Sequence, residues 1–439
     1  MSIQTSSENG NTSATSAAVL ADPMTVFLDA HYRSLPPSRG TKRFNAGEHA
    51  WLASRGADLA CANLKKSASG IQVDARIFSS IARRDKQQQL QYGELVALSG
   101  DFYESPDALF DEKPSPLPWL WEANDLSDLR AIFAKELKWI EDRLQQQGGK
   151  APYPDDNIRM AWNAKSYVEL ALRNVDHFGW HNIVAYCRYH TEAMALAASA
   201  DGRENENFRR ALYTNAFADH FLTDGFAAGH VRVPRAEICD WAASQGLNDK
   251  IAGALSKLLH DQDGHVDVHS LHGEHEEGAR DSSDGLQVMN SEGDAWHTYC
   301  DGQLFLDGSE KSPAVDRAVK AVADSVTELL FAWKRRQFPK NVYAATTRVP
   351  FPHPRAPTLT QKFAADMPDS DFEALWKSVQ WYAKVPWISG LQPKHLRSLF
   401  SALPAIMKRF RENVAAEAAQ LDIGRRIAPA YIDAYKRIA

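Results

Sequence analysis

Residues 208–235 combine a helical pattern with side chains that bind metal ions. The stretch reads FRRALYTNAFADHFLTDGFAAGHVRVPR and contains His220, Asp224 and His230. Residues four apart lie on one face of a helix, so the His220 imidazole and the Asp224 carboxylate are expected to point the same way. His230 follows and can turn back towards them. Two imidazoles and a carboxylate at one place suit a zinc-like cation.

The end of this helix is expected near Gly225 or Gly229, because glycine is a poor helix residue and a frequent stop signal. His230 then lies just beyond the helix. An ordinary helix-face pair and an unrelated loop histidine also explain the spacing, since short motifs often match by chance. The positions of the other histidines therefore decide between the two interpretations.

Histidine is concentrated in the same part of the chain. Of the 15 histidines, 11 lie between His177 and His297. The 4 cysteines are scattered and form no C-x-x-C pair, which argues against a disulfide framework and a cysteine-based zinc site. A metal ion would therefore be held by His, Asp and Glu side chains.

The length of 439 residues allows two or three domains. We expect an irregular or disordered tail over 1–40, a metal-dependent catalytic helical domain over 41–310, and a helical extension over 311–439. With 44% apolar and 24% charged residues, the composition is that of an ordinary globular protein. The net charge of −6 gives no reason to expect a polyanionic partner for the whole molecule.

The first residues do not read as a secretory signal. Residues 1–22 lack a basic segment, and the apolar run at 17–21 is too short. No run approaches the ~18 apolar residues of a membrane span. We expect a soluble protein that is cytoplasmic or exported by a route independent of an ordinary signal peptide.

Two candidate ligands precede the central stretch. A helical pattern over 44–61 carries His49 in its first turn, where a histidine ordinarily serves as a partner of the helix end. An apolar run from residue 92 ends in Gly100-Asp101, and the glycine allows a sharp turn that presents the Asp101 carboxylate. The ordinary explanation is a turn aspartate that bonds its own backbone.

Two further helices are expected before the central one. An amphipathic stripe predicts a helix over 125–147, and a longer helical region follows over 165–200. His177 and His181 lie in that region, four residues apart, and so share a face. We expect one of the two to be a ligand and the other a core group or a partner of the ligands.

His260 stands at the end of a helix expected over 247–262. His260 and Asp263 can face the same way, whereas Asp261 cannot join them. Several histidines follow among Gly, Ser and Glu over 265–279. We expect this segment to be a solvated loop.

A small β-hairpin is expected over 286–300, because two alternating segments flank Asn-Ser-Glu-Gly-Asp. Asp301 follows it and is either a helix cap or a late ligand. Helices are expected over 313–334 and through the last 70 residues. Over 394–439, nine Lys and Arg accompany four Asp and Glu. A basic amphipathic helix there can lie on an anionic membrane, although a helix that packs on the core looks similar and is the favoured interpretation.

The candidate ligands in chain order are His49, Asp101, His177, His220, Asp224, His230 and His260. This order resembles the bacterial zinc-dependent phospholipase C family, which shares its fold with the zinc-dependent single-strand nucleases. The most specific match is H-x-x-x-D-x5-H at 220–230, which has the spacing of the family's signature. The segment after His49 looks like the family's early ligand helix, and Gly100-Asp101 resembles its aspartate turn. The likeness covers residues 44–305.

The resemblance implies an all-α fold, a multi-helix bundle with a small β-hairpin insertion and a helical C-terminal extension. Two or three zinc ions would lie in a cleft between helices. The implied reaction is hydrolysis of a phosphatidylcholine-like glycerophospholipid by a metal-activated water, to diacylglycerol and a phosphorylated head group. Asp101 would orient or deprotonate that water.

The chain departs from the family at two places. The family's first ligand is the amino-terminal tryptophan of a processed chain, and nothing equivalent follows the tail here. The family also has a glutamate four residues after a late histidine, whereas Gly264 stands four residues after His260. Asp263 is the first substitute for that carboxylate and Asp301 the second.

Two other functions compete with the phospholipase. A single-strand nuclease would use the same ligands but needs a basic channel and aromatic stacking platforms, and the acidic central segment gives no support for these. A non-enzymatic protein would use the metal for stability and its basic C-terminal helices to bind a membrane or a partner protein. We favour a phospholipid substrate and no nucleic acid, and we keep peripheral membrane contact through the C-terminal helices as the less favoured alternative to packing on the core.

Overall fold

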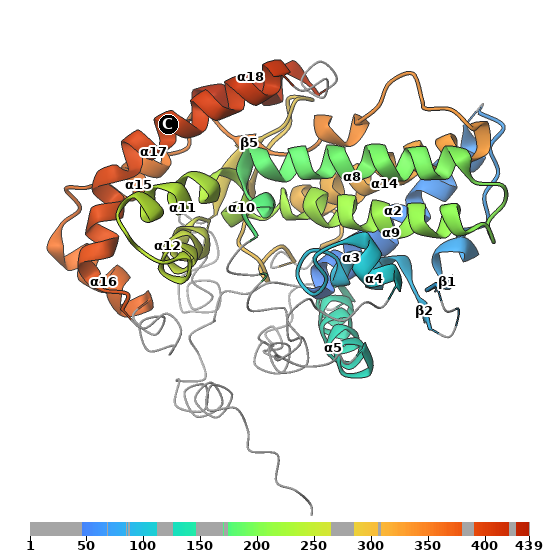
Figure 1. The fold of residues 1–439 in the computed structure, drawn as a ribbon, viewed down its shortest axis with the longest axis horizontal. Coiled ribbons are helices and arrows are strands. Elements are labelled where there is room, and N and C mark those ends of the chain that lie inside the picture. The colour runs from blue at the N-terminus through green and yellow to red at the C-terminus, as the bar shows by residue number, and fades with distance from the viewer. Residues whose placement is uncertain are drawn as a thin grey trace, which may run out of the picture. The chain divides into compact units, whose positions relative to one another are not determined.

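Helices make up most of the structure, and only short strands accompany them (Figure 1). The computed structural model describes residues 46–67, 69–84, 86, 88–111, 126–145, 170, 174–264, 285–305, 309–379, 390–420 and 427–438. All of these belong to one compact unit, Pro37–Ala439. The tail expected over 1–40 and the loop expected over 265–279 lie outside the described residues. The all-α expectation is confirmed at the level of a mostly helical chain with small sheets.

Long helices form the bundle that carries the site, and they are α2 (Ala46–Lys66), α8 (Gly179–Ser199), α9 (Glu206–Asp224) and α14 (Pro313–Arg335). Helix α9 packs along α8, and α14 packs against α2, α8 and α9. Every residue of α9 from Ala211 onward is buried, as expected of a helix surrounded by other elements. Helix α14 thus belongs to the bundle, although it begins just beyond the boundary expected at residue 310.

Helix α9 ends where its sequence predicts. Asn205 precedes it, and its side chain accepts a hydrogen bond from the backbone N–H of Asn207 at 2.8 Å. Asp224 is the last helical residue, and Gly225 follows as the cap. The short helix α10 (Ala228–Arg232) then carries His230, so this histidine lies just beyond α9 as expected.

The region expected to be helical over 165–200 is interrupted near His177. A 3-10 turn, η2 (Val175–His177), precedes α8. Gly179 has a φ of +56°, in the left-handed region, and this breaks the helical path between η2 and the body of α8. His177 and His181 therefore do not share a helix face, contrary to expectation. The helix expected over 125–147 is confirmed as α5 (Leu126–Gln145).

Shorter elements lie between α2 and α5, namely η1 (Ala75–Phe78), β1 (Ile81–Ala82), β2 (Gln89–Leu90), α3 (Tyr92–Leu98) and α4 (Pro106–Asp111). Strands β1 and β2 are antiparallel, with Ile81 opposite Leu90. Helix α3 packs against both α2 and α9, and α4 packs against α9. The turn that follows α3 is thereby held beside the bundle.

The expected hairpin is confirmed as β3 (Leu286–Met289) and β4 (Ala295–Thr298). A third strand, β5 (Phe351–Pro352), pairs antiparallel with β3 and places Phe351 opposite Met289. This pairing joins segments far apart in the sequence, so no local pattern predicts it. The strand order β4-β3-β5 puts β5 at an edge, where a proline is tolerated.

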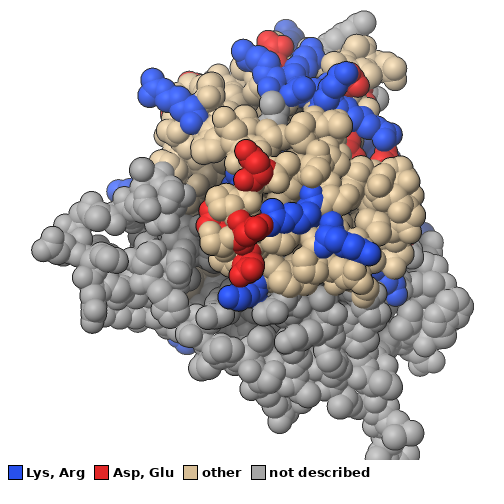
Figure 2. All heavy atoms as spheres, turned by 90° about the vertical axis from the view of Figure 1, so that its left-hand side faces the viewer, with Lys and Arg blue, Asp and Glu red and all other residues tan. Residues whose placement is uncertain are grey.

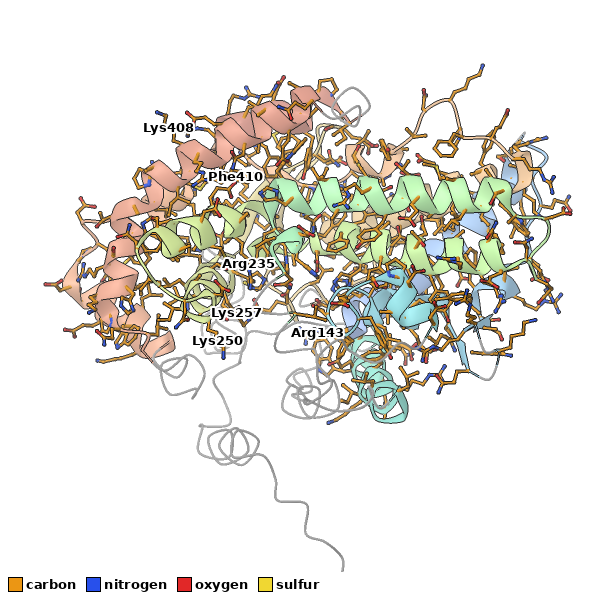
Figure 3. All side chains as sticks on the ribbon, in the orientation of Figure 1. Arg143, Arg235, Lys250, Lys257, Lys408 and Phe410 are labelled. Atoms are coloured by element: carbon orange, nitrogen blue, oxygen red, sulfur yellow. The ribbon has the colours of Figure 1, made fainter. Side chains whose placement is uncertain are left out.

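The remaining helices are α11 (Arg235–Ser244), α12 (Asp249–Gln262), η3 (Ala344–Thr347), α15 (Leu359–Lys362), α16 (Asp369–Val379), α17 (Pro393–Gln420) and α18 (Pro429–Arg437). Helix α12 packs on α11, and α17 packs on α11, α15 and α18. Phe410 of α17 is buried, whereas Lys408 points away from the protein (Figure 3). The apolar stripe of α17 is therefore used for packing on the core.

The basic residues of the C-terminal helices lie among acidic ones. Figure 2 views the side on which α16 and α17 lie in Figure 1, and it shows aspartate and glutamate beside lysine and arginine. Arg409 pairs with Asp240 at 2.8 Å, and Arg397 pairs with Asp369. No described helix has both the length and the apolar content needed to cross a membrane. Contact with a membrane surface stays a prediction.

Candidate metal centre

The Asp224 carboxylate, at the end of α9, lies among four imidazoles. Its Oδ2 is 2.7 Å from His177 Nδ1 and 3.6 Å from His220 Nε2. Its Oδ1 is 3.3 Å from His49 Nε2 and 3.9 Å from His230 Nε2. The four histidines come from four different elements, so the second interpretation of the central motif, an isolated helix-face pair, is wrong.

Eight side chains form three groups of potential ligands, and within each group the ligand atoms lie within 4.8 Å of one another. The groups are His49, Asp101 and His220; His177, His220 and Asp224; and His230, His260 and Asp301. We call these eight residues the metal centre. They are supplied by α2, the turn after α3, η2, α9, α10, α12 and the turn after β4.

Backbone carbonyl groups orient two of the imidazoles. His220 Nδ1 lies 3.1 Å from the carbonyl oxygen of Val96, and His230 Nδ1 lies 2.7 Å from that of His177. A carbonyl oxygen can only accept, so each Nδ1 carries the proton. The Nε2 lone pair of each ring then faces the other ligands, which is the usual arrangement of metal-binding histidines.

Thr223 orients His49 by the same logic. The Thr223 hydroxyl donates to the backbone carbonyl groups of Asp219 at 2.7 Å and His220 at 3.0 Å. It therefore accepts from His49 Nδ1, which lies 2.6 Å away. Since the proton is on Nδ1, the His49 Nε2 lone pair faces Asp224. No local pattern in the sequence links Thr223 to residue 49, so this partner of His49 is visible only in the structure.

Asp261 orients His260. His260 Nδ1 lies 2.8 Å from Asp261 Oδ1, which corrects the expectation that Asp261 cannot join this histidine. Adjacent helical positions point in different directions, but here the imidazole of the last helical turn bends towards its neighbour. A carboxylate behind a ligand histidine fixes the orientation of the ring.

The atoms that face the interior of the metal centre include several without hydrogen bonds. Among the described residues, these buried atoms include Asp101 Oδ1, His230 Nε2, His260 Nε2 and Asp301 Oδ2. All of them offer lone pairs once the imidazoles are neutral, and a buried acceptor without a partner is costly. A divalent cation between them removes that cost. The residues therefore fit a metal ion, and imidazole with carboxylate is a ligand set that zinc accepts.

Two glycines allow the backbone to approach the ligands closely. Gly100 has a φ of +73°, and a Cβ there would lie 2.7 Å from His220 Cδ2 and 2.9 Å from His177 Cε1. A Cβ on Gly229 would lie 2.3 Å from His260 Cδ2. The sharp turn expected at Gly100 is thus confirmed, and it presents Asp101 to the histidines.

The aspartates of the metal centre differ in their electrostatics. Burial raises the pKa of Asp101 to about 6, although His177 opposes the rise. Burial also acts to raise the pKa of Asp224, but the surrounding histidines, chiefly His230 and His220, hold it well below the usual value. Without a metal ion, Asp224 therefore stays ionised, whereas Asp101 takes up a proton more readily than an ordinary aspartate.

The pKa values of the histidines also differ with their surroundings. Burial lowers the pKa of His220 well below its usual value, although Asp224 opposes it. Burial also acts to lower the pKa of His230, but Asp224 and Asp301 outweigh it and raise that pKa to about 9. Without a metal ion, the carboxylates therefore hold a proton on His230. Only the neutral imidazole binds a metal ion, so a metal ion in this group would compete with protons for the ring.

Asp301, and not Asp263, completes the late ligand group. Asp301 Oδ2 lies 3.2 Å from His260 Nε2 and 3.4 Å from His230 Nε2. Asp263 is turned away and pairs with Arg232 through two contacts of 2.7 and 2.8 Å. Lys362 adds a third contact with Asp263 at 3.4 Å. The first substitute for the family's glutamate is therefore not in the metal centre, and the second is.

His181 also lies outside the metal centre. Its Nε2 is 3.5 Å from Glu237 Oε1, on α11. His177 is thus the member of the pair that meets the other ligands. The structure brings together His49, Asp101, His177, His220, Asp224, His230 and His260 as expected, and it adds Asp301.

A buried cation supports the ligand group of α10 and α12. Arg235 stands at the start of α11 (Figure 3), and its guanidinium lies 4.8 Å from the centre of the Phe178 ring. Phe178 in turn contacts His230 and His260, at ring distances of 4.8 and 5.5 Å. Burial lowers the pKa of Arg235 to about 10, which still leaves it charged at neutral pH.

Comparison of the chain with protein-family models gave no match, and comparisons with curated proteins and with solved structures gave none either. The likeness to zinc-dependent phospholipases C therefore rests on the residues themselves. A possible ligand set defines a class of site but not a reaction, because one fold can serve several functions.

Proposed function

We propose that this protein is a zinc-dependent phosphodiester hydrolase of the phospholipase C type. The observation that carries the proposal is the convergence of five histidines and three aspartates at one buried place. Seven of these eight residues are the candidate ligands of the sequence, and Asp301 is its second choice for the late carboxylate. The proposed substrate is a phosphatidylcholine-like phospholipid, and the products are diacylglycerol and a phosphorylated head group.

The ligand groups suit two metal ions. His220 belongs to two of the three groups, and one imidazole nitrogen has a single lone pair for one ion. One ion therefore suits the groups around His220, and another suits His230, His260 and Asp301. Asp224 lies near members of both, so its two oxygens can serve both ions.

Zinc at these positions would neutralise charge on the phosphodiester oxygens and lower the pKa of an attacking water. Asp101 has a buried carboxylate oxygen without a hydrogen bond, beside His49 and His220. It is the residue placed to orient that water and to accept its proton. Both oxygens of Asp224 lie against imidazoles, so Asp224 serves as a ligand.

Hydrolysis of phosphatidylcholine vesicles by the zinc-loaded protein tests the proposal. We expect release of phosphocholine, and we expect Asp101→Asn to slow it by about 10²-fold or more, as loss of a general base does. The matched control is Asp107→Asn, since Asp107 is an exposed partner of Arg210 and lies outside the metal centre. Zinc content of each variant is measured alongside.

Single-stranded DNA serves as the competing substrate. Cleavage of DNA with intact vesicles would replace the phospholipase with a nuclease. Bound zinc with no turnover on either substrate would favour a structural metal site. Turnover that survives Asp101→Asn at the parental rate would remove Asp101 from the mechanism.

A further inference from the structure

A pocket of about 550 Å³ opens at the other end of α9. It lies between η1, the β1–β2 hairpin and the first turns of α9, with Ile81, Phe208 and Leu212 among its walls. In Figure 1 this hairpin and α10 lie towards opposite ends of α9. Arg209 of the pocket and Asp224 of the metal centre are fifteen positions apart, or ~22 Å along a helix. The pocket is therefore separate from the metal centre.

Arg209 is a buried cation in the wall of this pocket. Only 8% of the residue is exposed. Its Nη1 donates to the carbonyl groups of Arg83 at 2.8 Å and Ala82 at 3.4 Å, and its guanidinium lies 5.5 Å from the centre of the Phe110 ring. Its Nε is buried without a hydrogen bond, and it forms no ion pair with any residue that the structure describes. A buried charge without a counter-ion is costly, so an anion in the pocket would stabilise it.

The rim carries two more guanidinium groups. Arg76 and Arg203 also line the pocket, against a single acidic lining residue among those described, Glu204. Arg203 contacts Glu204 at 2.9 Å, and Arg76 contacts Asp74, which does not line the pocket. Asp74 and Glu204 offset two of the three guanidinium charges, which leaves one net positive charge, that of Arg209. Arginine is the side chain best suited to bind phosphate and carboxylate groups.

The other walls are apolar. Ile77, Phe208 and Leu212 are buried side chains that face the same space. The volume is within the ~300–1,000 Å³ typical of pockets for small organic ligands. A ligand that uses both kinds of wall has an anionic end and an apolar body.

We propose that this pocket binds a small organic anion, whose phosphate or carboxylate group meets Arg209, Arg76 and Arg203 and whose apolar part contacts Phe208 and Leu212. The site is independent of the metal centre and of the proposed hydrolysis.

Calorimetric titration of the full chain with phenyl phosphate, benzoate, inorganic phosphate and phenol tests the proposal. We expect phenyl phosphate or benzoate to bind at least tenfold more tightly than phenol, and the stronger of the two identifies the anionic group. Inorganic phosphate should bind more weakly than phenyl phosphate, because it leaves the apolar wall unused.

Variants locate the binding. The double variant Arg76→Gln/Arg203→Gln should weaken binding at least tenfold, and Ala82→Leu should do the same by filling the pocket without changing its charge. The control is Arg210→Gln, because Arg210 pairs with Asp107 and does not line the pocket. Unchanged affinity in the double variant and in Ala82→Leu would overturn the proposal, and would place any bound phosphate at the metal centre. Equal binding of phenol and phenyl phosphate would also overturn it.

Discussion

Glu48 accepts a hydrogen bond from the backbone N–H of Gly302, with 3.1 Å between Oε2 and N. Its other carboxylate oxygen accepts from the N–H of Leu304 at 3.0 Å. Glu48 precedes His49, and Gly302 follows Asp301. The buried Glu48 carboxylate thus links the start of α2, which carries His49, to the turn that carries Asp301. The ligand group of His49 and the ligand group of Asp301 are therefore joined through this contact as well as through Asp224.

Replacing Glu48 by alanine should loosen the turn that holds Asp301. Loss of residues that orient ligands typically weakens metal binding by about 10- to 100-fold. Each unpaired N–H group should also lower the free energy of unfolding by about 1–3 kcal/mol. Zinc titration and urea denaturation measure both effects. Glu310→Ala is the control, since Glu310 is exposed and pairs with Arg55 on the surface. Parental zinc affinity in Glu48→Ala would contradict this role.

Asp301→Asn should mainly reduce bound zinc, whereas Asp263→Asn should mainly reduce stability. The first removes a ligand carboxylate from His230 and His260, so bound zinc should fall by about one ion per chain if a neutral amide is the poorer ligand. The second leaves the Arg232 guanidinium buried without its partner, which typically costs about 3–5 kcal/mol of stability. Zinc content by mass spectrometry and urea denaturation separate the two. Loss of zinc in Asp263→Asn alone would reverse the assignment of the late ligand.

Gly100→Ala should disrupt the metal centre. Its Cβ would meet His220 and His177 at less than 3.0 Å, in addition to the strain of a φ of +73°. Gly202→Ala is a matched control, because Gly202 has a φ of +88° with nothing within 4 Å. The control should cost about 1–2 kcal/mol, the usual strain of a left-handed residue with a Cβ. Gly100→Ala should cost more and should also reduce bound zinc. Equal stability and zinc content in both variants would show that the ligands make room for a methyl group.

His190, which lies outside the metal centre, should make stability depend on pH. It is fully buried, with Nδ1 2.7 Å from Asn215 Oδ1 and Nε2 3.0 Å from Glu328 Oε2. Burial acts to lower the pKa of His190, but the contact with Glu328 outweighs it and raises that pKa above the ordinary value. The folded state therefore holds this proton more tightly than the unfolded state.

The stabilisation from His190 is consequently complete below the unfolded pKa of ~6.5 and is lost as the pH rises through the folded pKa. His190→Gln removes this dependence. The difference in unfolding free energy between the parent and His190→Gln should shrink as the pH rises above ~6.5. Urea denaturation at a series of pH values, with saturating zinc throughout, measures it. A difference that stays constant with pH would show that folding does not raise the pKa of His190.

The sequence by itself determined the local features, such as which residues share a helix face and where a helix ends. The spacing of His220 and Asp224 puts both on one face of α9, and Gly225 ends the helix so that His230 follows at once. These relations depend on helical geometry and on the backbone preferences of glycine, which act over a few residues. The helix over 126–145 and the β3–β4 hairpin were predicted for the same reason.

Only the tertiary structure decided which distant side chains meet. The choice of Asp301 over Asp263 follows from Arg232, whose guanidinium binds Asp263 and turns it away. The choice of His177 over His181 follows from the break at Gly179. Strand β5 and helix α14 join partners far along the chain. Such contacts depend on how whole elements pack and on which charged side chain the packing brings next to a carboxylate. No local pattern of residues contains that information.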